Sequence, residues 1–170
     1  MNSNAPRIIV IGIGNEYRRD DAAGLLVVRR LKEYADDYAA DQNAILPMKI
    51  VEESGEGTAL MLAWEGAELA IIVDAVYGEG TPGGIYRGVF SGEEFLPPLP
   101  VNFCRYSTHA IGLGEAIELA RSFGTLPPEV IVYGIEIADV TAGIGVSPEV
   151  EATIDHVVGA ILMDLPPDNQ

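Results

Sequence analysis

Near its start the chain reads Ile8-Ile9-Val10-Ile11-Gly12-Ile13-Gly14-Asn15, followed shortly by Arg19-Asp20-Asp21. The apolar run predicts a buried strand over residues 7–13, and a helical pattern of apolar residues covers about 21–38. The chain therefore leaves a strand, turns on glycines and presents carboxylates where a helix starts. In open α/β sheets, ligands bind in the crevice beyond the carboxyl ends of the strands. We expect Asp21 to lie at that crevice.

Strands and helices alternate along the rest of the chain. Further strands are predicted at residues 49–52, 69–76, 85–90 and 130–135. Helices are predicted at residues 59–64, from Ser107 or Thr108 to about 123, and from Ser147-Pro148-Glu149 to Pro166-Pro167. This order indicates an α/β fold, a three-layer sandwich around a mostly parallel twisted sheet of about five strands. A chain of 170 residues fits one domain spanning 1–170, with its core at about 7–163.

The composition narrows the possible compartments and partners. The net charge is -16, which repels nucleic-acid phosphates and anionic lipid headgroups, so we expect neither partner. The sequence contains no apolar run long enough to span a bilayer and no signal-peptide pattern at its start. The single cysteine, Cys104, excludes an internal disulfide and suits a reducing compartment. These features together predict a cytoplasmic protein.

Three residues are candidates for chemistry. Asp21 starts a helix, where an acid can also serve simply as a cap. Asp74 ends the five-residue apolar core of the predicted strand 69–76, and the carboxyl end of a strand is the functional edge of an open sheet. His109 lies at the predicted start of a helix. We expect the other histidine, His156, to face solvent, because it lies opposite the apolar stripe of its helix. Two carboxylates and one imidazole would suit a divalent metal with open positions for substrate.

Two other kinds of site are disfavoured by the same residues. A dinucleotide-binding loop requires a third glycine where this chain has Tyr17, and paired acids at the helix start would repel a pyrophosphate. Cys104 lies five residues before His109, so a cysteine–histidine nucleophile pair is conceivable. However, the sequence offers no preceding helix N-terminus that would activate the thiol.

Several motifs in order resemble those of the hydrogenase maturation proteases. They are Gly12-x-Gly14-Asn15, Arg19-Asp20-Asp21-Ala22-Ala23-Gly24, Val73-Asp74-Ala75, Ser107-Thr108-His109, Gly134-Ile135-Glu136 and Gly143-Ile144-Gly145-Val146-Ser147-Pro148-Glu149-Val150. The resemblance extends from about residue 7 to residue 161. These proteases are endopeptidases that trim the large subunit of nickel–iron hydrogenases.

The resemblance implies a fold, a reaction and a set of site residues. The fold of the family is a three-layer sandwich around a five-stranded sheet. Its members remove a short C-terminal extension from the large-subunit precursor once nickel has been inserted. The family positions that contact this nickel fall on Asp21, Asp74 and His109, which are therefore the expected catalytic and metal-contacting residues. The nickel arrives with the substrate, and no organic cofactor is expected.

Two alternative functions remain open at this point. The chain could be a noncatalytic chaperone that senses nickel and holds the large subunit without cutting it. It could also be a nucleotide-binding α/β module, although Tyr17 argues against the dinucleotide form. The three side chains could also serve for recognition alone, with another group as the base.

Overall fold

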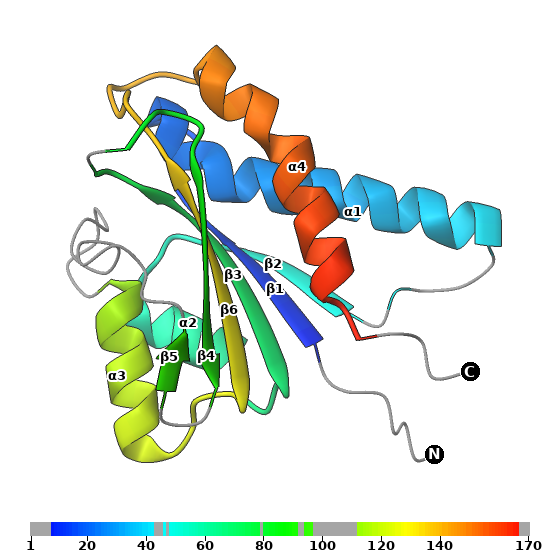
Figure 1. Ribbon diagram of the computed structural model, residues 1–170, viewed down its shortest axis with the longest axis vertical. Coiled ribbons are helices and arrows are strands. Elements are labelled where there is room, and N and C mark those ends of the chain that lie inside the picture. Colours follow the sequence, from blue (N-terminus) through cyan, green and yellow to red (C-terminus); the bar gives the residue numbers. More distant parts are fainter. Residues whose placement is uncertain are drawn as a thin grey trace.

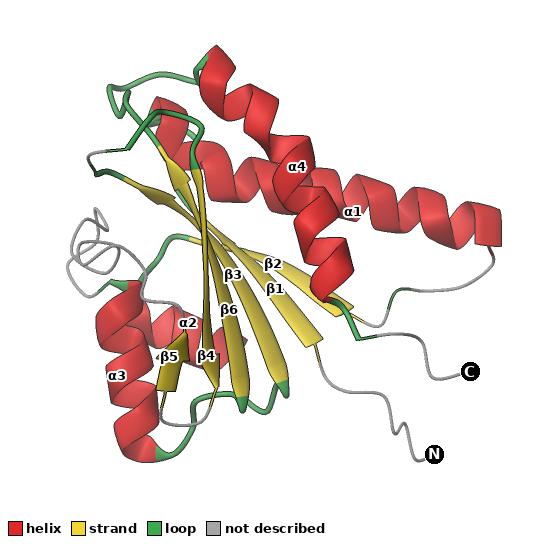
Figure 2. Ribbon diagram, viewed as in Figure 1, coloured by secondary structure: helices red, strands yellow, loops and turns green. Residues whose placement is uncertain are grey.

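The computed structural model describes residues 8–42, 46, 48–78, 80–91, 94–96 and 112–166. Its helices and strands alternate as expected for an α/β protein (Figures 1 and 2). In chain order they are β1 (Ile8–Ile13), the 3-10 helix η1 (Arg19–Ala22), α1 (Ala23–Gln42), β2 (Met48–Glu53), α2 (Gly57–Ala63), β3 (Leu69–Val76), β4 (Ile85–Ser91), β5 (Glu94–Leu96), α3 (Leu113–Phe123), β6 (Glu129–Glu136) and α4 (Pro148–Asp164).

One sheet of six strands forms the middle layer, in the order β2-β1-β3-β6-β4-β5. β1, β2, β3 and β6 are parallel, whereas β4 runs antiparallel to both β6 and β5. The predicted fold class is therefore confirmed. The five strands expected from the sequence are all present, and the sheet adds the three-residue strand β5 at its edge. Such a short edge strand leaves little periodicity to detect in a sequence.

Helices cover both faces of the sheet, which creates two separate apolar cores. α1 and α4 pack on one face, and α2 and α3 pack on the other (Figure 1). Side chains alternate between faces along a strand, so β1 supplies Val10 to the α1/α4 core and Ile11 to the α2/α3 core. β1, β3 and most of β6 are buried on both faces, as their continuous apolar runs predict.

Several predicted helix boundaries need correction. α1 begins at Ala23, because residues 19–22 form the tighter turn η1. α3 begins at Leu113 with Gly112 at its N-cap, so the prediction of a cap at Ser107 or Thr108 was wrong. Glu115 at the third helical position accepts a hydrogen bond from the Gly112 N–H at 3.0 Å. The cap is thus made by a residue inside the helix, a pattern that a search for a capping serine or threonine overlooks.

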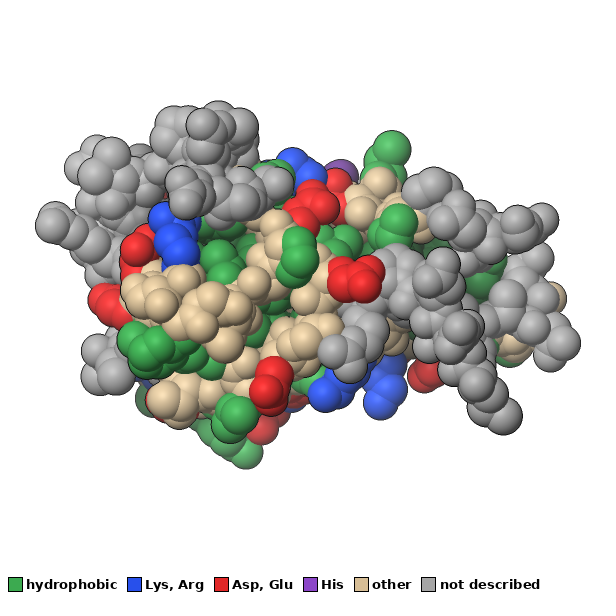
Figure 3. Space-filling model, turned by 90° about the horizontal axis from the view of Figure 1, so that it is seen from below, with side chains coloured by type: hydrophobic (Ala, Val, Ile, Leu, Met, Phe, Trp, Pro, Cys, Tyr) green, Lys and Arg blue, Asp and Glu red, His purple; other side chains and the backbone are tan. Residues whose placement is uncertain are grey.

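Acidic side chains are spread over one face of the molecule (Figure 3), and the described helices are not of the membrane-spanning kind. On the face seen in Figure 3, acidic side chains lie mostly apart from one another, among apolar and other side chains. None of the helices in the described ranges combines the length and the apolar character needed to cross a membrane.

Glycines allow α1 to approach the sheet very closely. A Cβ atom on Gly24 would lie 2.3 Å from the Ile13 carbonyl oxygen and 2.4 Å from that of Val73. A Cβ atom on Gly12 would lie 2.3 Å from the Gly24 carbonyl oxygen. Because these contacts are with backbone atoms, they cannot be relieved by a side-chain rotation. The start of α1 is therefore seated directly on the ends of β1 and β3.

We expect Gly24→Ala to lower the free energy of unfolding by about 1–3 kcal/mol, because the added methyl group overpacks a backbone contact. Gly159 provides a matched control, since it also lies within a helix but a Cβ atom there meets nothing within 4 Å. Gly159→Ala should raise the free energy of unfolding by about 0.5–1 kcal/mol through helix propensity. Urea unfolding of both variants measures the two effects. Equal effects of the two substitutions would contradict the close approach.

Candidate functional site

The carboxyl ends of β1 and β3 form the switch point of the sheet. The two strands are adjacent and parallel, with Gly12 paired to Val73. β2 lies beyond β1 on one side and β6 lies beyond β3 on the other. The chain therefore leaves in opposite directions from this pair of strands, which opens a crevice at their ends. Asp21, in the turn that follows β1, and Asp74, near the end of β3, lie at this crevice.

Asp21 and Asp74 are both buried, with 4% and 7% of their surface exposed. The pKa of the Asp74 carboxyl is raised to about 7, mainly by burial and secondarily by the nearby charge of Asp21. A hydrogen bond from the Ala75 N–H acts in the opposite direction. The fold thus holds Asp21 close enough to influence the ionisation of Asp74 at a poorly solvated site.

The turn between β1 and α1 positions Asp21 through its backbone. The Asn15 N–H donates to the Asp21 carbonyl oxygen at 3.3 Å, and the Asp21 N–H donates to the Arg18 carbonyl oxygen at 3.1 Å. A Cβ atom on Gly14 would lie 2.1 Å from the Asp21 carbonyl oxygen. Gly14 is therefore required for the turn to fold back tightly onto Asp21.

Asp20 has a structural role, although it is adjacent to Asp21 and fully buried. Its carboxylate accepts hydrogen bonds from the backbone N–H groups of Ala138, Asp139 and Ser147, at 3.3, 3.1 and 2.6 Å. The Ser147 hydroxyl also donates to it at 3.1 Å. Ser147 is the predicted N-cap residue of α4, but its side chain makes no capping bond and contacts Asp20 instead. Asp20 therefore fastens the loop before α4 to the turn after β1.

Of the two histidines, the structure describes only His156. His109, together with Ser107, Thr108 and Cys104, lies outside the described residues, so its proposed role stays a prediction. His156 is exposed on α4, as predicted, and its Nδ1 lies 3.0 Å from the Ala152 carbonyl oxygen. Among the residues that the structure describes, no group of three His, Cys, Asp or Glu side chains is arranged to hold a metal ion.

Glu136 is a buried acid that sequence reasoning left without a role. It ends β6 next to β3, only 2% exposed, and its Oε1 accepts a hydrogen bond from the Gly78 N–H at 2.7 Å. Its carboxylate also raises the pKa of the Tyr86 hydroxyl through a hydrogen bond. Glu136 thus positions the loop that follows β3 beside the crevice. The available signal was the one used for Asp74, an acid at the end of an apolar strand.

A hollow of about 340 Å³ adjoins the turn that carries Asp21. It lies at the ends of β1 and β2 and includes Asn15, Glu16 and Tyr17 on one side and Glu52 and Glu53 on the other. The Arg29 guanidinium binds Glu52 with two hydrogen bonds of 2.9 and 2.7 Å, which lowers the pKa of that carboxyl. Tyr17, the residue that breaks the dinucleotide pattern, is 63% exposed at this hollow.

The fold and the crevice place this chain among α/β proteins with an acidic site at the switch point of the sheet. Comparison with known proteins identifies the family within that class. The family model for hydrogenase maturation protease (HycI) matches residues 26–164. The hydrogenase 2 maturation protease of Escherichia coli K12 is 27% identical over 161 residues, covering 94% of this chain and 90% of that protein. The hydrogenase expression/formation protein HupD of Rhodobacter capsulatus is 26% identical over 162 residues, covering 94% of this chain and 71% of that protein.

Solved structures agree with the fold. The hydrogenase maturating endopeptidase HybD from E. coli superposes with a TM-score of 0.72 at 23% identity, covering 92% of this chain and 90% of that one. HybD from Thermococcus kodakarensis gives a TM-score of 0.66 at 23% identity, covering 92% of this chain and 97% of that one. The chain belongs to the hydrogenase maturation protease family. It is therefore a peptidase that processes hydrogenase.

The titration of Asp74 predicts a pH-dependent stability. Between about pH 4 and pH 7 the folded chain retains a proton on Asp74 that the unfolded chain releases, so stability falls as the pH rises through this window. Asp74→Asn removes the buried charge. We expect it to raise the free energy of unfolding by on the order of 3 kcal/mol at pH 8 and to have little effect near pH 4.

Urea unfolding of the metal-free chain across this pH range measures the effect. Asp36→Asn, at an exposed position of α1, serves as the control and should leave the pH profile unchanged. Parallel profiles of the parent chain and Asp74→Asn would contradict the raised pKa.

The role assigned to Asp20 predicts a large loss of stability without it. Asp20→Ala leaves the amides of Ala138, Asp139 and Ser147 without their carboxylate acceptor, so the free energy of unfolding should fall by about 3 kcal/mol or more. Asp139→Ala removes a half-buried carboxylate that lies 3.8 Å from Arg19 and accepts hydrogen bonds from the Thr141 N–H and hydroxyl at 2.9 and 2.7 Å. It should cost only about 1 kcal/mol, because these contacts lie close to solvent. Similar losses in the two variants, measured by urea unfolding, would argue against the structural role of Asp20.

Proposed function

We propose that this chain removes the C-terminal extension of a nickel-loaded nickel–iron hydrogenase large-subunit precursor. In this proposal Asp21, Asp74 and His109 contact the nickel that the precursor carries. The side chains thereby test whether the metal has been inserted before the peptide bond is cut. The reaction would take place in the cytoplasm, with no organic cofactor.

The observation that carries the proposal is the pair of buried carboxylates at the switch point. Burial and mutual repulsion disfavour the charged form of Asp74, and a cation placed between two carboxylates would offset both costs. Carboxylate and imidazole groups are suitable ligands for a divalent transition metal. A substrate-borne nickel ion therefore matches the chemistry of Asp21 and Asp74 and the predicted third ligand, His109.

A divalent metal at such a site can polarise a carbonyl group or lower the pKa of a bound water. The chain's own contribution is to complete the coordination of the ion and to hold it in a crevice of low polarity. Asp74 has an additional capacity, since a carboxyl with a pKa of about 7 can hold or release a proton near neutral pH. The backbone fixes the position of Asp21, because the turn that carries it packs closely at Gly12, Gly14 and Gly24.

Processing assays with two variants test the assignment. We expect His109→Ala and Asp21→Asn each to slow cleavage of nickel-loaded precursor by about 100-fold or more, because each removes a ligand to the substrate metal. The parent chain should cleave nickel-loaded precursor and leave nickel-free precursor intact. Mass spectrometry of the precursor after incubation reports loss of the extension.

Matched controls separate these effects from a general loss of histidine or charge. His156→Ala removes the exposed histidine of α4, and Glu65→Gln removes an exposed carboxylate beyond the end of α2. Both should process the precursor within about twofold of the parent rate, as surface changes usually do. Full cleavage by His109→Ala and Asp21→Asn would refute their roles. An unchanged precursor mass with the parent chain would instead favour a noncatalytic chaperone.

A further inference from the structure

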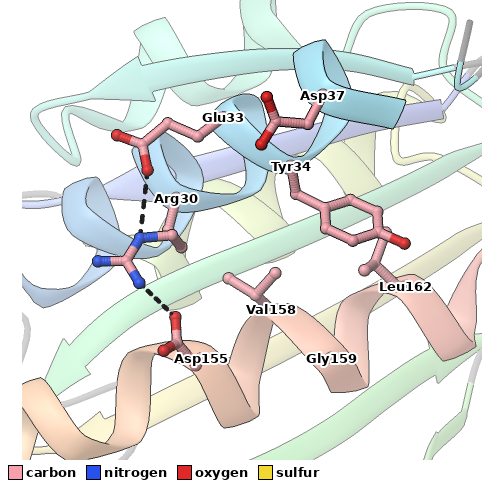
Figure 4. A pocket seen from close by; sticks show the side chains of 8 residues that line it. All are labelled: Arg30, Glu33, Tyr34, Asp37, Asp155, Val158, Gly159 and Leu162. Atoms are coloured by element: carbon pink, nitrogen blue, oxygen red, sulfur yellow. Dashed lines mark hydrogen bonds and ion pairs between the residues drawn. The ribbon is translucent and has the colours of Figure 1, made fainter. Parts of the chain in front are cut away.

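A groove between α1 and α4 lies apart from the carboxylate crevice. It has a volume of about 370 Å³ and is lined from α1 by Arg30, Glu33, Tyr34 and Asp37, and from α4 by Asp155, Val158, Gly159 and Leu162 (Figure 4). An α-helix rises about 1.5 Å per residue, so Tyr34 lies about 16 Å along α1 from its start at Ala23. A short peptide bound at the crevice would not fill this groove, whereas a folded protein could contact both places.

The floor of the groove is apolar and hollow. The Tyr34 ring of α1 lies toward the Leu162 end of the groove, and Val158 of α4 lies nearer the Asp155 end (Figure 4). Tyr34 keeps 46% of its surface exposed and stacks on Tyr38 one turn further along α1, with ring centroids 6.5 Å apart. Gly159 makes the hollow, since a Cβ atom there would meet nothing within 4 Å.

The rim of the groove is acidic. Glu33 and Asp155 share one guanidinium, that of Arg30, at 3.3 and 2.6 Å. Asp37 adds a third carboxylate against this single positive charge (Figure 4). The rim therefore keeps a negative charge even after its own ion pairs have formed.

The charges in the carboxyl-terminal part of α1 are unfavourably placed with respect to the helix dipole. Asp36, Asp37 and Asp41 occupy its carboxyl-terminal part, and its last turn contains no basic residue. The negative end of the helix dipole favours the opposite charge there. The placement of these acids is thus unfavourable with respect to the helix dipole, but they would attract a basic partner, as would the net charge of -16.

We propose that this groove is a docking site for the folded body of the hydrogenase precursor. The precursor inserts an apolar side chain over Gly159, between Tyr34 and Leu162, and places Lys or Arg side chains against Glu33, Asp37 and Asp155. The inference rests on the proposed function, because the precursor is the partner that must be held while its C-terminus is cut. A second copy of this chain fits the groove poorly, since it would bring more acid to an acidic rim.

Two groove variants and two matched controls test the docking site in processing assays. Gly159→Leu fills the hollow, and Asp37→Lys reverses a rim charge. Each should raise KM for nickel-loaded precursor about tenfold and change kcat less than about twofold, because the crevice is untouched. Gly159→Ala adds only a methyl group, and Glu65→Lys makes the same charge change near α2, on the opposite face of the sheet. Both controls should stay within about twofold of the parent KM.

Salt gives an independent readout. Raising the ionic strength should increase the parent KM, and Asp37→Lys should show a weaker salt dependence because part of the charge attraction has been removed. An unchanged KM in both groove variants would overturn the docking site. So would an equal rise in KM in the controls.

The same variants keep this inference separate from the proposed function. If the parent chain binds the precursor but does not cleave it, the proposed function fails, and calorimetric affinities of the four variants still report on the groove. Loss of affinity confined to Gly159→Leu and Asp37→Lys would support docking. Equal affinities, or no binding by the parent chain, would overturn it. A dimer of the parent chain in light scattering that Gly159→Leu abolishes would assign the groove to a second copy and also overturn the proposal.

Discussion

The backbone contact between the start of α1 and the ends of β1 and β3 is the constraint on which the rest of the structure depends. A Cβ atom on Gly12 would meet the Gly24 carbonyl oxygen, and a Cβ atom on Gly24 would meet the carbonyl oxygens of Ile13 and Val73. This contact pulls the turn between β1 and α1 over the switch point of the sheet and carries Asp21 with it. Asp20 then ties the same turn to the loop before α4, through its bonds to Ala138, Asp139 and Ser147. One seated turn therefore connects the sheet, both helices of one layer and the candidate site.

The close contact between α1 and the sheet also brings Asp21 near Asp74, whose pKa is raised first by its own burial and then by the charge of Asp21. Burying one carboxylate near another costs free energy, which the raised pKa of Asp74 records. A fold selected for stability alone would place a neutral residue at one of the two positions. Asp20, in the same turn, is buried at less cost, because backbone amides and a hydroxyl donate hydrogen bonds to its carboxylate. Of the two adjacent acids, Asp20 therefore has a structural role.

Much of the site was predictable from local patterns, and the failures have physical causes. Asp74 could be found because an acid that ends a buried apolar run is conspicuous, and Glu136 carried the same signal. The resemblance singled out Asp21, but the local pattern gave Asp20 no separate role, because both residues are acids at a helix start. Only contacts with residues more than a hundred positions away separate them. The true start of α3 was missed because its N-cap is a glycine served by Glu115.

The amino-acid sequence alone was enough to predict the α/β class, the bounds of β3 and the hydrogenase maturation protease family. Those features depend on apolar periodicity and short ordered motifs, which are local properties of the chain. The structural role of Asp20 and the short sixth strand at the sheet edge became visible in the three-dimensional structure. The structure decides the features that follow from packing. It also decided that α1 and α4 leave an acidic groove between them. These features arise because side chains distant in sequence meet in space, and the consequences of burial and charge depend on those neighbours.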